Sequence, residues 1–137
     1  MMVRSYKYLG FVITPSGEIC TGLKDLRDRA LKAFMKMKND MGTSINKDIL
    51  VTLSLIESLI KPILLYCSDF LGCLKLLQTN PIEKLYMMIC KQLLGVQKQT
   101  TNWWVLLERG RIPLCTFATK FAIKNWERIR LGESNPP

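Results

Sequence analysis

The side chains best suited to chemistry in this chain are cations, and the chemistry that they suit is the binding of phosphate groups. Lysine and arginine neutralise phosphates by direct contact and displace condensed counterions. Two rows of basic residues carry these cations. The first row consists of Lys24, Arg27, Arg29, Lys32 and Lys36. The second row lies near the end of the chain, at Lys120 and Lys124. Both rows also fit the solvated rim of an ordinary amphipathic helix, which stays open as the alternative.

The charge of the whole chain has the same sign as these rows. Its 137 residues include 20 Lys and Arg against 11 Asp and Glu, which gives a net charge of +9. Such an excess of positive charge favours a polyanionic partner, with nucleic acid as the first candidate and an anionic membrane as the second. A basic protein without such a partner has the same composition and stays open as the alternative. The apolar content of 48% indicates one packed domain and argues against disorder.

Several classes of site are excluded by composition. The chain has no histidine, so histidine acid–base catalysis, histidine zinc sites and histidine triads are excluded. Asp25 and Asp28 lie one turn apart among basic residues, which predicts a surface ion network and not a magnesium site. The sequence therefore predicts no catalytic residue, no metal site and no cofactor.

The cysteines and the hydropathy pattern bear on location. The five cysteines form no C-x-x-C pair and have mostly apolar neighbours, which predicts buried thiols in a reducing, intracellular compartment, the cytoplasm or the nucleus. The most apolar stretch, residues 49–66, is interrupted by Glu57, Lys61 and Pro62. It fits a buried helix better than a membrane span, so no membrane partner is expected.

Helical periodicity dominates the chain after residue 20. Gly42, Gly95, Gly110 and Gly132 mark helix ends, and Pro62 predicts a kink or restart within the second helix. The fold class is mainly α, a bundle of four or five helices, with residues 67–79 as an irregular connection. Phe121 and Trp126 are expected in the core, and one of Trp103 and Trp104 at the surface. The predicted helices cover residues 22–41, 49–64, 81–94, 103–109 and 113–131.

The N-terminal residues have a different composition. Strand-forming residues run from Tyr6 to Ile13, and Pro15-Ser16-Gly17 is a turn signal, so strand is expected between Tyr6 and about Ile19. The predicted division is a β-hairpin over residues 1–19, a helical bundle over 20–132 and a frayed tail over 133–137. Because a lone hairpin can bury only one face, we expect its tertiary packing to be weak.

The order of several short motifs adds a resemblance to a known family. From about Ser5 to Leu131 the chain resembles the C-terminal end of the reverse transcriptase region of non-LTR (LINE-type) retrotransposons. It departs from the usual pattern at Cys67, at Leu71 and at Arg109. The motifs are the segments at residues 6–11, 61–66, 89–95 and 110–114, with a Gly17 turn and a basic helix after the first of them.

The resemblance implies a role in handling nucleic acid. Tyr8, Leu9 and Gly10 match the primer-grip hairpin, and the helices match the thumb, which follows template–primer phosphates. The family's fingers and palm, with the metal-binding aspartate pair, lie upstream of the hairpin, so this chain is not expected to be an enzyme by itself. The predicted function is sequence-independent binding of template–primer duplex or RNA/DNA hybrid.

Two alternatives from other classes stay open. One is a protein–protein interaction module, whose partner is an upstream palm and fingers region or a second copy of the chain. The other is a remnant of a retroelement with no function. Ancestry does not decide among these readings, because function depends on the sites that survive.

Overall fold

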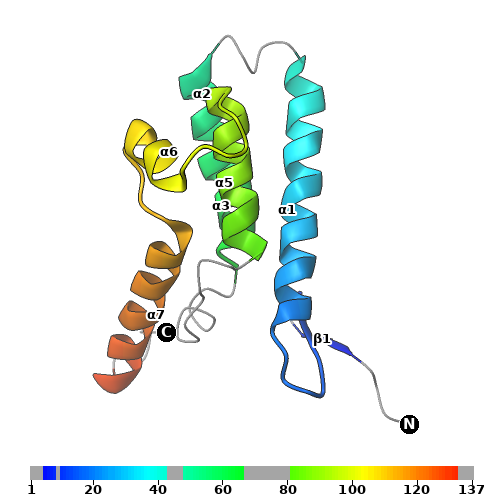
Figure 1. Cartoon of the computed structure of the whole chain (residues 1–137). Helices are drawn as coiled ribbons and strands as arrows, with labels where there is room; N and C mark the ends of the chain where they lie inside the picture. Colours follow the sequence, from blue (N-terminus) through cyan, green and yellow to red (C-terminus); the bar gives the residue numbers. More distant parts are fainter. Residues whose placement is uncertain (1–4, 9, 43–47, 67–80, 133–137) are drawn as a thin grey trace.

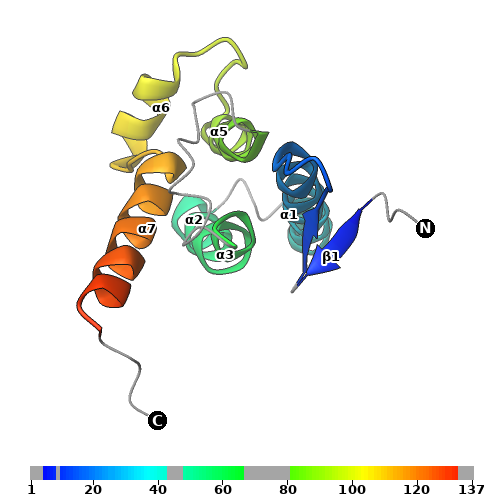
Figure 2. The same ribbon diagram turned by 90° about the horizontal axis from the view of Figure 1, so that it is seen from below.

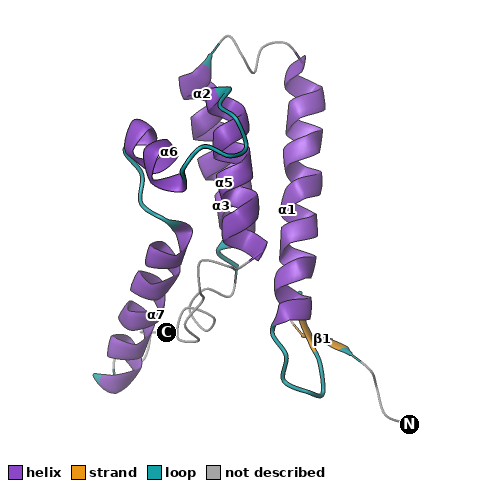
Figure 3. Cartoon of the chain, in the orientation of Figure 1, coloured by secondary structure: helices purple, strands orange, loops and turns teal. Residues whose placement is uncertain are grey.

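The computed structural model describes residues 5–8, 10–42, 48–66 and 81–132. Within them a two-stranded hairpin precedes a helical bundle, which confirms the predicted fold class (Figures 1 and 3). The predicted connection at 67–79 and the predicted tail at 133–137 lie outside the described residues. The elements are β1 (Tyr6–Tyr8), β2 (Phe11–Ile13), α1 (Cys20–Met41), α2 (Ile49–Leu55), the π-helical segment η2 (Ile56–Ile60), α3 (Lys61–Leu64), α5 (Pro81–Leu94), α6 (Asn102–Arg109) and α7 (Leu114–Arg130).

The hairpin turns earlier than the sequence predicts. β1 pairs with β2 antiparallel, with Tyr8 opposite Phe11, so the chain reverses between these residues, where Gly10 has a φ of +86°. Glycine adopts a positive φ without the steric cost that other residues meet there. The Pro15–Gly17 turn instead joins β2 to α1. Strand therefore ends at Ile13, inside the predicted limits of Tyr6 and about Ile19.

The hairpin is docked on α1 through β2. Gly22 is buried in α1, and a Cβ built there would lie 2.2 Å from Cζ of Phe11, so the ring rests on the bare helix backbone. Arg29 also donates a hydrogen bond to the carbonyl oxygen of Gly10. All three residues of β1 are exposed, whereas Phe11 packs against the core. The predicted weak packing therefore describes β1 and is wrong for β2.

The core lies where α1 meets α5 and the segment formed by η2 and α3. Its most deeply buried members include Leu26, Ile56, Ile60, Tyr86 and Ile89. Seen along the helices, α5 and the α2–α3 segment lie between α1 on one side and α7 on the other (Figure 2). The bundle is thus built around α5, which contacts α1, α6 and α7.

Pro62 produces the predicted irregularity in the second helix. Proline lacks a backbone N–H, and its ring clashes with the carbonyl four residues earlier in a regular α-helix. The chain forms a wider π-helical segment, Ile56–Ile60, immediately before α3. Such a segment relieves the clash without ending the helix.

The packing of α7 differs from the prediction. Its buried residues are Leu114, Ala118 and Ala122, a row with one member every four residues. Phe121 and Trp126, expected in the core, are 43% and 55% exposed. Apart from Leu114, the contact face of α7 therefore consists of alanines and not of its rings. Both tryptophans of α6, not one, are exposed.

We expect Gly22→Ala to detach the hairpin from α1. Alanine favours a helix over glycine by about 1 kcal/mol, but overpacking against a ring costs about 1–3 kcal/mol, so the cost falls on the docked strand. Amide hydrogen exchange of β1 and β2 should become at least about tenfold faster while the core of α1 stays protected. Thr21→Ala, at an exposed neighbouring position, is the control. Unchanged exchange in the hairpin of Gly22→Ala would contradict the docking contact.

Candidate nucleic-acid interface

The outward side of α1 presents lysines whose charges are not neutralised. Lys24, Lys32 and Lys36 are exposed, and none forms an ion pair with another residue that the structure describes. The nearby acids already have partners. Asp28 pairs with Arg27 at 3.0 Å, and Asp25 pairs with Arg29, which confirms the predicted surface ion network. The lysines are therefore available to an external anion.

Arg29 has a different role from the one predicted. Its guanidinium donates hydrogen bonds to the Gly10 carbonyl and to the Asp25 carboxylate, and the side chain is about two-thirds buried. A cation held by two internal acceptors is not free to follow phosphates. Arg29 instead fixes the hairpin turn on α1.

Lys32 and Lys36 lie toward the side of α1 on which the hairpin is docked, whereas Lys24 lies on another side of the helix. Gly22, Arg29 and Lys36 are spaced by seven residues, so they lie nearly on one line along the helix. The hairpin contacts α1 at Gly22 and at Arg29. Lys36 lies further along the same line, past the hairpin turn, and Lys32 lies about one helical turn before Lys36. Tyr8, from the predicted grip, is 57% exposed, whereas Leu9 lies outside the described residues.

The basic residues of α7 do not join this edge. Lys120 and Lys124 are exposed, as predicted, but α5 and the α2–α3 segment separate α7 from α1 (Figure 2). The two predicted rows therefore form two surfaces. The sequence could not show this separation, because the arrangement of the helices depends on contacts between distant segments.

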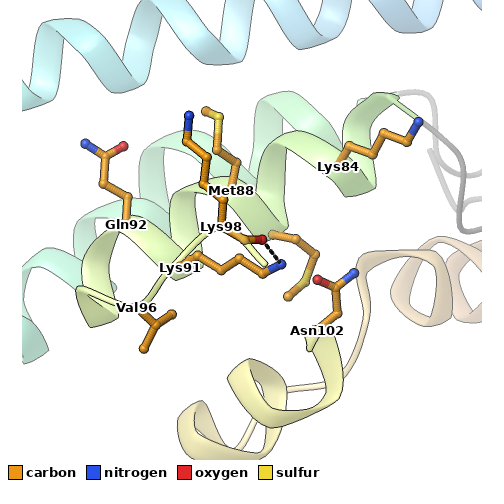
Figure 4. Close-up of a pocket in the computed structure, with 8 residues that line it drawn as sticks. Lys84, Met88, Lys91, Gln92, Val96, Lys98 and Asn102 are labelled. Carbon is orange, nitrogen blue, oxygen red and sulfur yellow. Dashed lines mark hydrogen bonds between the residues drawn. The ribbon is translucent and has the colours of Figure 1, made fainter. Parts of the chain in front are cut away.

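A basic groove on α5 is a feature that sequence reasoning missed. It encloses about 680 Å³ and is lined by Lys84, Met88, Lys91 and Lys98 among others (Figure 4). A neighbouring hollow of about 410 Å³ shares Lys84 and Met88 and reaches Arg27 of α1. The predicted phosphate contact Arg27 thus lies on the opposite edge of α1 from the hairpin.

Glu83 of α5 holds the start of α7 by direct hydrogen bonds, although the two segments are far apart in sequence. Its Oε1 accepts a hydrogen bond from the Leu114 N–H at 3.3 Å, and its Oε2 accepts one from the Cys115 N–H at 3.1 Å. These donors belong to the first turn of α7, whose cap residue, Pro113, supplies no side-chain hydrogen bond. Burial raises the pKa of Glu83, and the two backbone hydrogen bonds oppose that rise.

A second buried polar cluster joins α5 to α6. Arg109 donates a hydrogen bond to the Cys90 sulfur, and its guanidinium carbon lies 5.8 Å from the centre of the Tyr86 ring. Burial raises the pKa of Tyr86 to about 12 and also raises the pKa of the Cys90 thiol. The cluster therefore joins α5 to α6 through buried polar contacts.

The cysteines follow the predicted pattern only in part. Cys90 is buried and Cys115 is half-buried, but Cys20 is exposed at the start of α1. Across residues 5–8, 10–42, 48–66 and 81–132, no three cysteine or acidic side chains are grouped as metal ligands require. None of the helices in this part of the chain is long and apolar enough to cross a membrane.

Compared with protein-family models, with curated proteins and with solved structures, the chain gives no significant match. The resemblance to a reverse transcriptase thumb therefore stays a prediction from the sequence.

The raised pKa of Glu83 predicts a pH-dependent stability. The folded protein holds the Glu83 proton more tightly than the unfolded chain, so this stabilising contribution is complete below the ordinary value of 4.5 and is lost as pH rises through the folded pKa. The free energy of unfolding of the wild type, measured relative to Glu83→Gln by urea denaturation, should fall as pH rises above 4.5. Glu108→Gln, at an exposed site, should show no such trend. A wild-type advantage that grows with pH would mean that the charged carboxylate at the start of α7 outweighs its burial.

Proposed function

We propose that this chain is a nucleic-acid-binding module, a thumb-like bundle with a primer-grip-like hairpin, that binds template–primer duplex without sequence preference and is not an enzyme by itself. The observation that supports this most directly is the unpaired lysines on the edge of α1 where the hairpin is docked. Such a module acts inside the cell, in the cytoplasm or the nucleus, where its nucleic acid lies.

The dimensions of α1 suit a phosphate backbone. The lysines on the hairpin side of α1 are Lys32 and Lys36, because Lys24 lies about a third of a turn around the helix from Lys36. Lys32 and Lys36, about 6 Å apart along the axis, can each meet a different phosphate. The lysines carry no base-specific geometry, so the contact fixes position and orientation and does not read sequence.

The contribution of the hairpin follows from its docked state. The Gly10 carbonyl is already hydrogen-bonded to Arg29, so its backbone is not free to hold a primer strand. The exposed ring of Tyr8 offers a stacking face instead. We therefore assign the grip to the Tyr8 side chain and assign Gly10 to the turn.

The nucleic-acid interface is tested by removing two of its charges. Lys32→Gln with Lys36→Gln should weaken binding of a labelled duplex or RNA/DNA hybrid at least about tenfold at about 50 mM salt, and should lower the salt slope by about two, because each lysine releases about one counterion. Fluorescence anisotropy measures both quantities.

The matched control is Lys84→Gln with Lys98→Gln, which removes the same charge from the α5 groove. Its effect on nucleic-acid binding should be clearly smaller. An equal loss in both variants would show that binding follows net charge and not the edge of α1, and binding that is insensitive to salt would reject phosphate contact.

The enzyme prediction is negative. Nucleotide transfer by two metal ions needs carboxylates free to bind them, and Asp25 and Asp28 are each engaged by an arginine. We expect no primer extension by the purified chain with Mg²⁺ or Mn²⁺ on any template. Extension that persists through purification and disappears in Asp25→Asn with Asp28→Asn would overturn this part of the proposal.

A further inference from the structure

We propose that the groove on α5 binds an acidic amphipathic helix of a partner protein. The groove is lined by residues of α5, of the connection at 95–101 and of the start of α6, and it encloses about 680 Å³ (Figure 4). This inference concerns a different surface from the proposed nucleic-acid interface and does not depend on it.

The charge of the groove selects an acidic partner. Lys84, Lys91 and Lys98 line it, and no aspartate or glutamate is among its lining residues or those of the neighbouring hollow. The ammonium group of Lys91 donates a hydrogen bond to the Lys98 carbonyl at 3.0 Å, which holds the connection against α5. The ammonium groups of Lys84 and Lys98 make no ion pair with the residues described, so an incoming carboxylate meets unneutralised cations.

Besides the lysines, the lining has three apolar residues and the two amides Gln92 and Asn102. Met87, Met88 and Val96 lie there, and Met88 and Val96 are 39% and 38% exposed although the core of the bundle is close by. Methionine is flexible and polarisable, so such a surface adapts to varied apolar side chains. An occupant with leucine-like side chains facing the methionines gains from burial, which a purely polar occupant does not.

The lining residues of α5 form one continuous row, against which a second helix can lie. Lys84, Met88 and Lys91 stand at i, i+4 and i+7 along one face of α5. The adjoining hollow shares Lys84 and Met88 and extends the concave surface to Leu31 of α1. A helix whose apolar stripe is bordered by glutamates matches this alternation of apolar and basic positions, as in other helix-in-groove complexes.

Nucleic acid fits the groove less well than a protein helix. No tyrosine, tryptophan or phenylalanine lines it, so it offers no ring on which a base could stack. The one arginine of the adjoining hollow, Arg27, already pairs with Asp28. Phosphate contacts by the lysines and by the amides of Gln92 and Asn102 would leave the methionine surface unused.

The probe is a fluorescent amphipathic helical peptide with leucines at i, i+3, i+4 and i+7 and glutamates beside them. Lys84→Glu with Lys98→Glu should weaken its binding at least about tenfold, since like charges then face each other across the contact. Met88→Gln should weaken it severalfold. Lys32→Glu with Lys36→Glu, the matched change on α1, should have less than about a twofold effect. In the wild type, the methyl resonance of Met88 should shift when the peptide is added.

Each other outcome overturns the proposal in a recognisable way. No wild-type binding at about 1 mM peptide, near the weakest affinity that such titrations detect, excludes this partner class. Equal binding of a scrambled peptide of the same composition shows attraction by charge without a docked helix. If the groove variant loses oligonucleotide binding and keeps peptide binding, the groove is a nucleic-acid site. Because the α1 variant separates the two surfaces, either proposal can fail without the other.

Discussion

The contact between the Phe11 ring and the bare backbone at Gly22 sets how the rest of α1 is used. It lets β2 lie against the helix, and Arg29 then reaches the Gly10 carbonyl and completes the docking. α1 thereby has three different sides: one buried against α5 and η2–α3, one covered by the hairpin, and one facing solvent. The basic residues of α1 have different roles, depending on the side of the helix on which they lie. Arg29 is used in structure, Arg27 faces the hollow beside α5, and Lys32 stays free.

The sequence predicts elements well where the deciding signal is local. α1 ends at Met41 because Gly42 adopts a positive φ, and α5 begins at Pro81 because proline suits the first turn of a helix. The hairpin shows the limit of local signals. Gly10 and Gly17 are both good turn residues with positive φ, and their local sequence does not show that the strands reverse at Gly10. Periodicity likewise places Phe121 on an apolar face of α7 but does not show that the alanines make the contact.

Long-range hydrogen bonds mark a further limit. Pro113 starts α7 without a capping side chain, so the sequence shows that the first N–H groups of this helix need an acceptor. It does not show that Glu83, 31 residues before Leu114, is that acceptor. The same holds for Arg109 and Cys90, which are 19 residues apart and on different helices. These partners meet only when α6 and α7 pack on α5, so they are known only from the fold.

The net charge of +9 is therefore distributed over several surfaces, and those on α1 and α5 differ in chemistry. On α1 the free lysines project from an exposed helix face beside a hairpin with an exposed tyrosine, and such a surface favours an anion with stacking groups. On α5 the lysines border a surface lined by methionines, and such a surface favours an anion that also carries apolar groups. Coulomb attraction is similar in both, because it depends on charge and distance. The class of partner is decided by what lies between the cations, and that depends on how α1, α5 and α6 pack.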